Sequence, residues 1–161
     1  MQTLKMLGIA FITVVALSAA AGANERRHLP VFRLTDVTGQ AVSSGQLTRA
    51  GNWLLVYVRP DCRACDAVLQ SVEADDAPWL APRIAVVVQA VDLAAVEATQ
   101  RRFPSLAGAT WYGDAAAGAR ALRVTNAPVV FGVRDGIIEW SVAGVLSDAT
   151  DVKTIMANWA R

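Results

Sequence analysis

The amino-acid sequence predicts an α/β domain with a mixed β-sheet flanked by helices. Two apolar, β-prone segments, residues 53–58 and 83–91, are each followed by apolar residues at helical spacing, which is typical of parallel strands joined by helices. Farther along, Asp135-Gly136 joins two more apolar segments and is the dipeptide of a tight antiparallel hairpin. A parallel half followed by a hairpin and a closing helix makes the expected sheet mixed.

Turn and cap residues divide the chain into successive elements. We expect, in order, a strand at 29–34, a turn at 36–40 with a return strand at 41–42, a short helix from Ser43 or Ser44 to 49, a strand at 53–58, a helix at 63–74, a strand at 83–91, a helix at 93–103 capped by Asp92, a short strand at 109–112, a helix at 115–122 capped by Asp114, strands at 124–133 and 137–142, and a last helix capped by Ser147 or Asp148 with an apolar stripe of Val152, Ile155, Met156 and Trp159.

The only two cysteines of the 161-residue chain, Cys62 and Cys65, lie where the strand at 53–58 ends and a helix begins. Pro60 ends the strand because a proline fixes its own φ and biases the preceding residue toward extended geometry. The first amides of a helix have no partners within the helix and carry the positive end of the helix dipole. They would stabilise a thiolate at Cys62, and the thiolate is the form that attacks disulfides.

The N-terminus has the pattern of a secretory signal peptide. Lys5 precedes an uncharged apolar run that ends in Ala21-Gly22-Ala23, so we assign residues 1–23 to a signal peptide, 24–29 to a polar linker and 30–161 to the folded domain. An uncleaved membrane anchor is the alternative, since the run has borderline length for spanning a bilayer. We expect a periplasmic location, where the cysteine pair is either a disulfide or a working dithiol.

Charge and ligand types exclude other classes of function. Lys5 is the only basic residue of the signal segment, so the rest of the chain has 14 basic and 14 acidic residues, and no basic footprint for nucleic acid remains. The single histidine, His28, lies in the expected linker, so four soft metal ligands cannot be assembled. We expect no metal, no cofactor and no nucleic-acid partner.

This order of elements resembles the thioredoxin superfamily. A strand, Cys62-Arg63-Ala64-Cys65, a helix, a strand led by Pro128, the Asp-Gly hairpin and Gly144 follow one another, and the matching elements run from Pro30 to Trp159. The 62 residues between Cys65 and Pro128 make the chain similar to the exported TlpA/ResA-like thioredoxins. The resemblance implies a three-layer thioredoxin-like fold with an extra βα insertion before the proline-led strand.

The resemblance also implies roles for individual residues. Cys62 would be the exposed nucleophile and Cys65 the more buried resolving thiol. Pro128 would follow a cis peptide bond and face the disulfide, leaving the backbone groups of Ala127 free to pair with a substrate strand. Arg63 would lower the pKa of the Cys62 thiol, and Asp61 would work against it.

Four positions depart from the family pattern. Arg63-Ala64 stands between the cysteines instead of Gly-Pro, and valines, Val56 and Val68, occupy the positions of the acids that are usual six residues before the first cysteine and three after the second. The usual proton acceptor for Cys65 is therefore missing. Asp61, Asp66 or water would have to serve.

We predict an exported thiol-disulfide oxidoreductase that exchanges disulfides with a protein client through Cys62 and Cys65. The TlpA-like resemblance favours a reductant, with a redox partner protein supplying electrons. An inert structural disulfide is the simplest alternative for the cysteine pair. At the level of the whole protein, the alternative is a redox-inert thioredoxin-like module that binds an extended peptide between the cysteine turn and Pro128.

Overall fold

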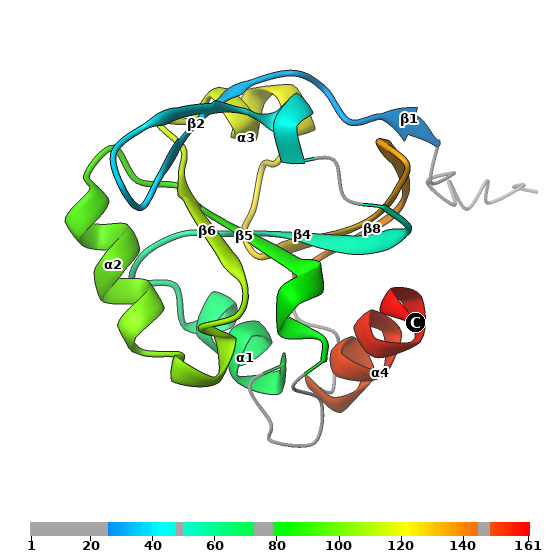
Figure 1. Cartoon of the computed structure of the whole chain (residues 1–161). Coiled ribbons are helices and arrows are strands. Elements are labelled where there is room, and N and C mark those ends of the chain that lie inside the picture. Colours follow the sequence, from blue (N-terminus) through cyan, green and yellow to red (C-terminus); the bar gives the residue numbers. More distant parts are fainter. Residues whose placement is uncertain (1–25, 48–49, 73–78, 145–148) are drawn as a thin grey trace, which may run out of the picture.

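The computed structural model describes residues 26–47, 50–72, 79–144 and 149–161. The strands of these ranges form one eight-stranded sheet. The strands are β1 (Arg27–His28), β2 (Arg33–Asp36), β3 (Ala41–Ser43), β4 (Asn52–Val58), β5 (Ile84–Val88), β6 (Thr110–Gly113), β7 (Val129–Arg134) and β8 (Ile137–Ala143). Their order across the sheet is β1-β8-β7-β4-β5-β6-β2-β3 (Figure 1).

Helices lie on both faces of this sheet (Figure 1). On one face α1 (Arg63–Val72) packs beside α4 (Ala149–Ala160), and on the other lies α3 (Ala117–Leu122). The fourth helix, α2 (Leu93–Arg101), packs against β6. Three short 3₁₀ helices complete the described part of the chain: Ser44–Leu47, Ala81–Arg83 and Pro104–Leu106.

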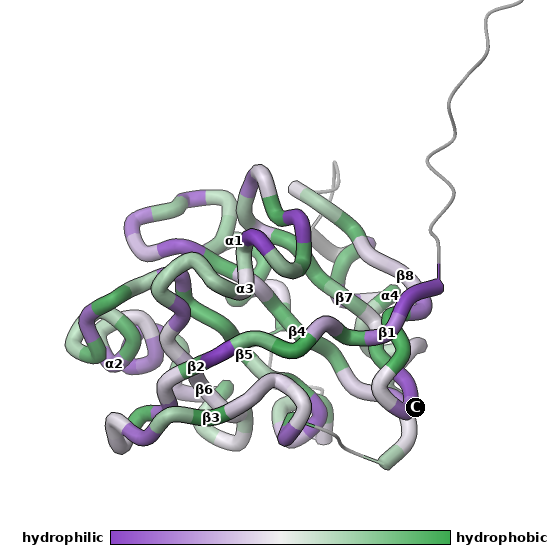
Figure 2. Tube along the Cα trace, turned by 90° about the horizontal axis from the view of Figure 1, so that it is seen from above, coloured by the Kyte–Doolittle hydropathy of each residue, from purple (hydrophilic) through white to green (hydrophobic). Residues whose placement is uncertain are grey.

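Strand β4 is the buried centre of the sheet. It pairs in parallel with β5 and antiparallel with β7, and β5 pairs in parallel with β6. The central strands β4 and β5 are hydrophobic apart from Asn52. At the sheet edge, β1 is hydrophilic (Figure 2). The predicted α/β class with a mixed sheet flanked by helices is confirmed.

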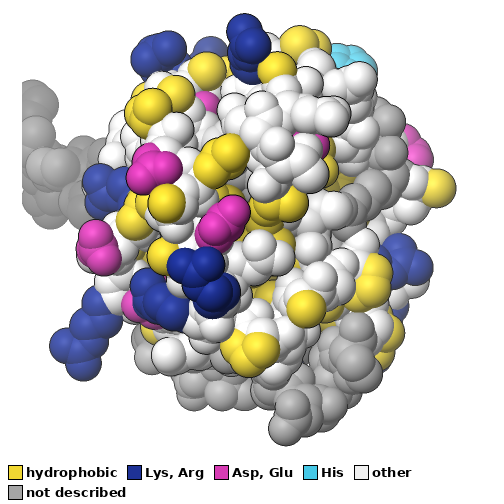
Figure 3. Space-filling view, turned by 60° about the vertical axis from the view of Figure 1, so that its left-hand side comes forward, with side chains coloured by type: hydrophobic (Ala, Val, Ile, Leu, Met, Phe, Trp, Pro, Cys, Tyr) yellow, Lys and Arg dark blue, Asp and Glu magenta, His cyan; other side chains and the backbone are white. Residues whose placement is uncertain are grey.

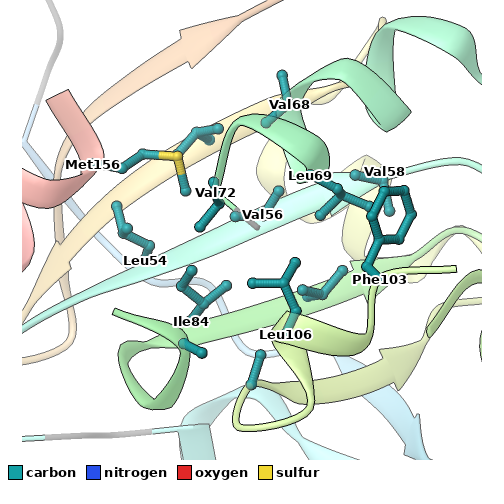
Figure 4. Packing of buried hydrophobic residues seen from close by; sticks show 14 of the residues in the cluster. Leu54, Val56, Val58, Val68, Leu69, Val72, Ile84, Phe103, Leu106 and Met156 are labelled. Atoms are coloured by element: carbon teal, nitrogen blue, oxygen red, sulfur yellow. The ribbon is translucent and has the colours of Figure 1, made fainter. Parts of the chain in front are cut away.

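Side chains of β4 alternate between two hydrophobic cores. Leu54, Val56 and Val58 face the core under α1 and α4, which Figure 4 shows together with side chains from α1 and from the segment around Phe103. Trp53, Leu55 and Tyr57 face the second core, on the side of α3. This alternation follows from the two-residue period of a strand, and burial on both faces explains the continuous apolar run in the sequence.

The predicted hairpin is confirmed, with Asp135 and Gly136 both in the left-handed region at φ of 50° and 77°. Two consecutive residues with positive φ are what a type I′ turn requires. The strand before it, β7, begins at Val129 rather than 124. The strand expected at 83–91 ends at Val88, because the next residues turn toward α2.

The boundaries of several elements differ from the prediction. Arg27–His28, placed in a linker, forms β1 and pairs with Ile137 and Ile138 of β8; two polar residues leave no periodicity to detect. The strand expected at 29–34 lies at Arg33–Asp36, and Ile155 of the α4 stripe is 38% exposed. The expected caps at 147–148 and the residues after Val72 in the first helix lie outside the described residues.

Asp114 caps the start of α3, as the sequence predicts, but it lies two residues before the N-cap position. The N-cap position is Ala116, with φ of 75° and no side-chain hydrogen bond. The buried Asp114 carboxylate instead accepts hydrogen bonds from the amides of Gly118 (2.9 Å) and Ala119 (3.1 Å). It also accepts one from the Tyr57 hydroxyl at 2.6 Å, which ties α3 to the centre of the sheet.

Burial raises the pKa of Tyr57, and the hydrogen bond to Asp114 raises it further. Because the pKa is higher in the folded than in the unfolded chain, this tyrosine contributes stability that is fully present below about pH 10 and falls as the pH rises above it, by about 1.4 kcal/mol per pH unit. We expect Tyr57→Phe to lower the unfolding free energy at neutral pH by about 1–3 kcal/mol. The deficit should shrink above pH 10 in denaturant titrations. If the difference in unfolding free energy between wild type and Tyr57→Phe stayed constant above pH 10, the raised pKa of Tyr57 would be contradicted.

Candidate active site

Cys62 lies at the point where β4 gives way to α1. After Val58 the chain turns through Pro60 and Asp61, whose φ of 52° is in the left-handed region that aspartate tolerates better than most residues. The Cys62 carbonyl accepts the first helical hydrogen bond, from the Asp66 amide at 3.0 Å. The Cys65 amide donates to Cys62 Sγ at 3.2 Å. Cys62 thus occupies the N-cap position, and its sulfur receives an amide that has no partner within the helix.

The two cysteines form a disulfide, with their Cα atoms 5.2 Å apart, but their surroundings differ. Cys65 is 1% exposed and belongs to the core under α1, together with Val56 and Val68. Cys62 is half-buried at the rim of the same core. Cys62 is therefore the more accessible cysteine of the pair, and Cys65 lies in apolar surroundings.

The loop that leads into β7 lies against the disulfide. The Ala127–Pro128 peptide bond is cis, and the Ala127 carbonyl oxygen lies 3.9 Å from Cys62 Sγ. The Gly144 amide donates to the Pro128 carbonyl at 2.8 Å, which fixes the loop to the end of β8. The fold thus brings together two segments separated by 65 positions in the sequence.

The charged residues singled out from the sequence lie in different settings. Asp61 and Arg63 are exposed on either side of Cys62. Asp66 is half-buried, and its carboxylate forms an ion pair with Arg102, the residue that follows α2. On the face shown in Figure 3, Lys and Arg side chains lie beside Asp and Glu side chains. Sequence reasoning missed Arg102, because nothing in the spacing of residues indicates a contact between α1 and the end of α2.

A cavity of about 160 Å³ adjoins the proline loop on the side of α3. Thr125 and Asn126, immediately before Ala127, line it together with Arg27 and Arg123. Apolar side chains of β7 also line it, so it could accommodate a side chain that combines an apolar stem with an acceptor group.

Within the described ranges, His, Cys, Asp and Glu residues form no group of three or more that could hold a metal ion. The helices of the same ranges include none with the length and hydropathy needed to span a bilayer.

A comparison of the sequence with protein-family models finds no match, and neither does a comparison with curated proteins. Solved structures do match. A protein of Chlorobium tepidum provisionally assigned as the thiol:disulfide interchange protein DsbE has a TM-score of 0.66 and 18% identity, over 83% of this chain and 94% of the other. A secreted Mycobacterium tuberculosis disulfide oxidoreductase has a TM-score of 0.63 and 15% identity, over 79% of this chain and 95% of the other.

A third structure, a thio-disulfide isomerase from Thermus thermophilus, has a TM-score of 0.62 and 18% identity, over 81% of this chain and 94% of the other. At these identities the likeness concerns the fold, and it extends over nearly the whole of each matched protein. The chain has the thioredoxin-like fold, with its one pair of cysteines at the start of α1.

Proposed function

We propose that this protein is an exported thiol-disulfide oxidoreductase that acts through Cys62 and Cys65. The observation that carries the proposal is the asymmetry of the disulfide: Cys62 is half-buried at a helix start, while Cys65 is 1% exposed. An inert structural disulfide requires no such difference, whereas stepwise exchange requires one sulfur that a client can reach and one that acts only within the protein.

In the reducing direction, the Cys62 thiolate attacks one sulfur of a client disulfide. A Cys62–client bond forms, the client disulfide breaks, and the other client sulfur leaves as a thiolate. Cys65 then attacks Cys62 Sγ, which releases the second client sulfur and closes the Cys62–Cys65 disulfide. The client gains two electrons and this protein loses two; the proton of Cys65 passes to the leaving thiolate, directly or through water or Asp61.

Backbone and side-chain groups around Cys62 support the binding of an extended client segment. The Ala127 carbonyl, 3.9 Å from Cys62 Sγ, is placed to accept a hydrogen bond from a client amide next to the reacting sulfur. Pro128, which follows Ala127 in the same loop, is buried. Exposed Arg63, at the first helical position, would favour the thiolate, and exposed Asp61 would oppose it.

The proposed direction of electron flow and the proposed location of the protein are argued from similarity to other proteins. The matched proteins include a secreted disulfide oxidoreductase and an exposed lipoprotein thioredoxin of Streptococcus pneumoniae, which supports a site of action outside the cytoplasm. Together with the signal-peptide pattern of residues 1–23, this similarity favours a periplasmic location for the protein. We propose a reductant of a protein client, returned to the dithiol form by a second redox protein.

The difference in burial predicts unequal reactivity of the two thiols. After reduction, a small alkylating reagent should modify Cys62 faster than Cys65 by about tenfold or more, because exposure and helix-start stabilisation both favour the Cys62 thiolate. Mass spectrometry of peptides from briefly alkylated protein measures the ratio, and denatured protein is the control in which the rates should converge. Equal rates in the folded protein would contradict the proposed roles.

A trapping experiment tests the exchange itself. Cys65→Ala should accumulate a mixed disulfide with a disulfide-containing peptide, because Cys62 can attack but nothing resolves the product. Cys62→Ala, the matched control, should form far less adduct through the buried Cys65. Non-reducing electrophoresis and mass spectrometry detect the adduct. If wild-type protein bound the peptide but exchanged no disulfide with peptide or glutathione, the redox-inert binding module would replace this proposal.

A further inference from the structure

We infer that the Arg102–Asp66 ion pair is a positioning pair that sets the reduction potential of the Cys62–Cys65 disulfide. The inference rests on the proposed function and adds to it a residue, Arg102, from outside the cysteine segment.

Asp66 lies one helical turn after Cys62. Its amide donates to the Cys62 carbonyl at 3.0 Å, which fixes the i, i+4 relation at the helix start. Residues so related have Cβ atoms about 5–6 Å apart, and helical side chains lean toward the N-terminus. The Asp66 carboxylate therefore lies on the side of α1 that faces Cys62. Alone, it would oppose a negative charge on that sulfur.

Arg102 is brought to this carboxylate by the end of α2. Its backbone amide donates to the Thr99 carbonyl at 3.1 Å, so the chain is still in its last helical turn there. Its guanidinium lies over the ring of Phe103, 5.4 Å from the ring centre. Phe103 is 2% exposed and packs in the same core as Cys65. The arginine is thus anchored on the core that holds the resolving cysteine.

Other charged residues lie near Cys62 in the sequence. Arg59, Asp61 and Arg63 are exposed, and the Arg102 side chain is 43% exposed, whereas the Asp66 side chain is 27% exposed. Removing the Arg102 charge leaves Asp66 uncompensated, which destabilises the Cys62 thiolate and favours the disulfide. Removing the Asp66 charge leaves the arginine, which has the opposite effect.

The test is redox equilibrium of the full chain with glutathione at pH 7, measured for wild type, Arg102→Gln, Asp66→Asn and the double variant. Arg102→Gln should shift the equilibrium about threefold toward the disulfide and Asp66→Asn about threefold toward the dithiol, as for a unit charge about 6 Å away in a water-like dielectric. Each shift corresponds to about 15 mV. The double variant should lie between the two single variants.

Arg101→Gln is the matched control. Arg101 precedes Arg102 in the chain but pairs with Glu97 at 3.6 Å on the surface of α2, with side-chain exposures of 70% and 51%. Its replacement should leave the equilibrium at the wild-type value. The shifts caused by the other two variants should shrink as salt is raised to about 0.5 M, because the charges are partly exposed.

Opposite signs are the decisive result, since a purely structural role would change both single variants in the same direction through lost packing. The apparent pKa of the Cys62 thiol, measured from its pH-dependent alkylation rate, should rise in Arg102→Gln and fall in Asp66→Asn. Shifts of equal sign, or none beyond the Arg101→Gln control, would overturn the inference. A wild-type disulfide that does not equilibrate with glutathione would overturn the proposed function instead.

Discussion

The burial of β4 on both faces is the constraint on which the rest of the structure depends. Every side chain from Trp53 to Val58 is at most 1% exposed, and the strand pairs with β5 on one side and β7 on the other. A strand so enclosed cannot shift its register by one residue without moving an apolar set out of each core. Its end is therefore a fixed point, and Cys62 is placed four residues beyond it.

The same central position explains why the cysteine pair and the proline loop meet. β7 is the neighbour of β4, and antiparallel pairing of Tyr57 with Val129 places the start of one strand beside the end of the other. Ala127 and Pro128 immediately precede that start. Strand pairing thus brings Cys62 Sγ within 3.9 Å of the Ala127 carbonyl.

Polar groups at the ends of the parallel strands are satisfied in two different ways. On the side of α3, the buried Asp114 carboxylate accepts hydrogen bonds from the Tyr57 hydroxyl and from two helix amides. On the side of α1, Cys62 Sγ accepts a hydrogen bond from the Cys65 amide, and Asp66 forms an ion pair with Arg102. The first arrangement stabilises the fold, while the second leaves a polarisable sulfur at the rim of an apolar core, where nearby charges can shift its ionisation.

The sequence alone determined the α/β class, the central strands, the Asp-Gly hairpin and the place of the cysteines between a strand and a helix, because periodicity, turn chemistry and caps are local properties. It did not disclose β1, the hydrogen bond from Tyr57 to Asp114 or the pairing of Asp66 with Arg102. Those contacts join residues of little local signal, such as Arg27 and Arg102, to partners that only the packed sheet brings near. Local patterns set which elements form, and tertiary packing decided which charges and carbonyls surround Cys62.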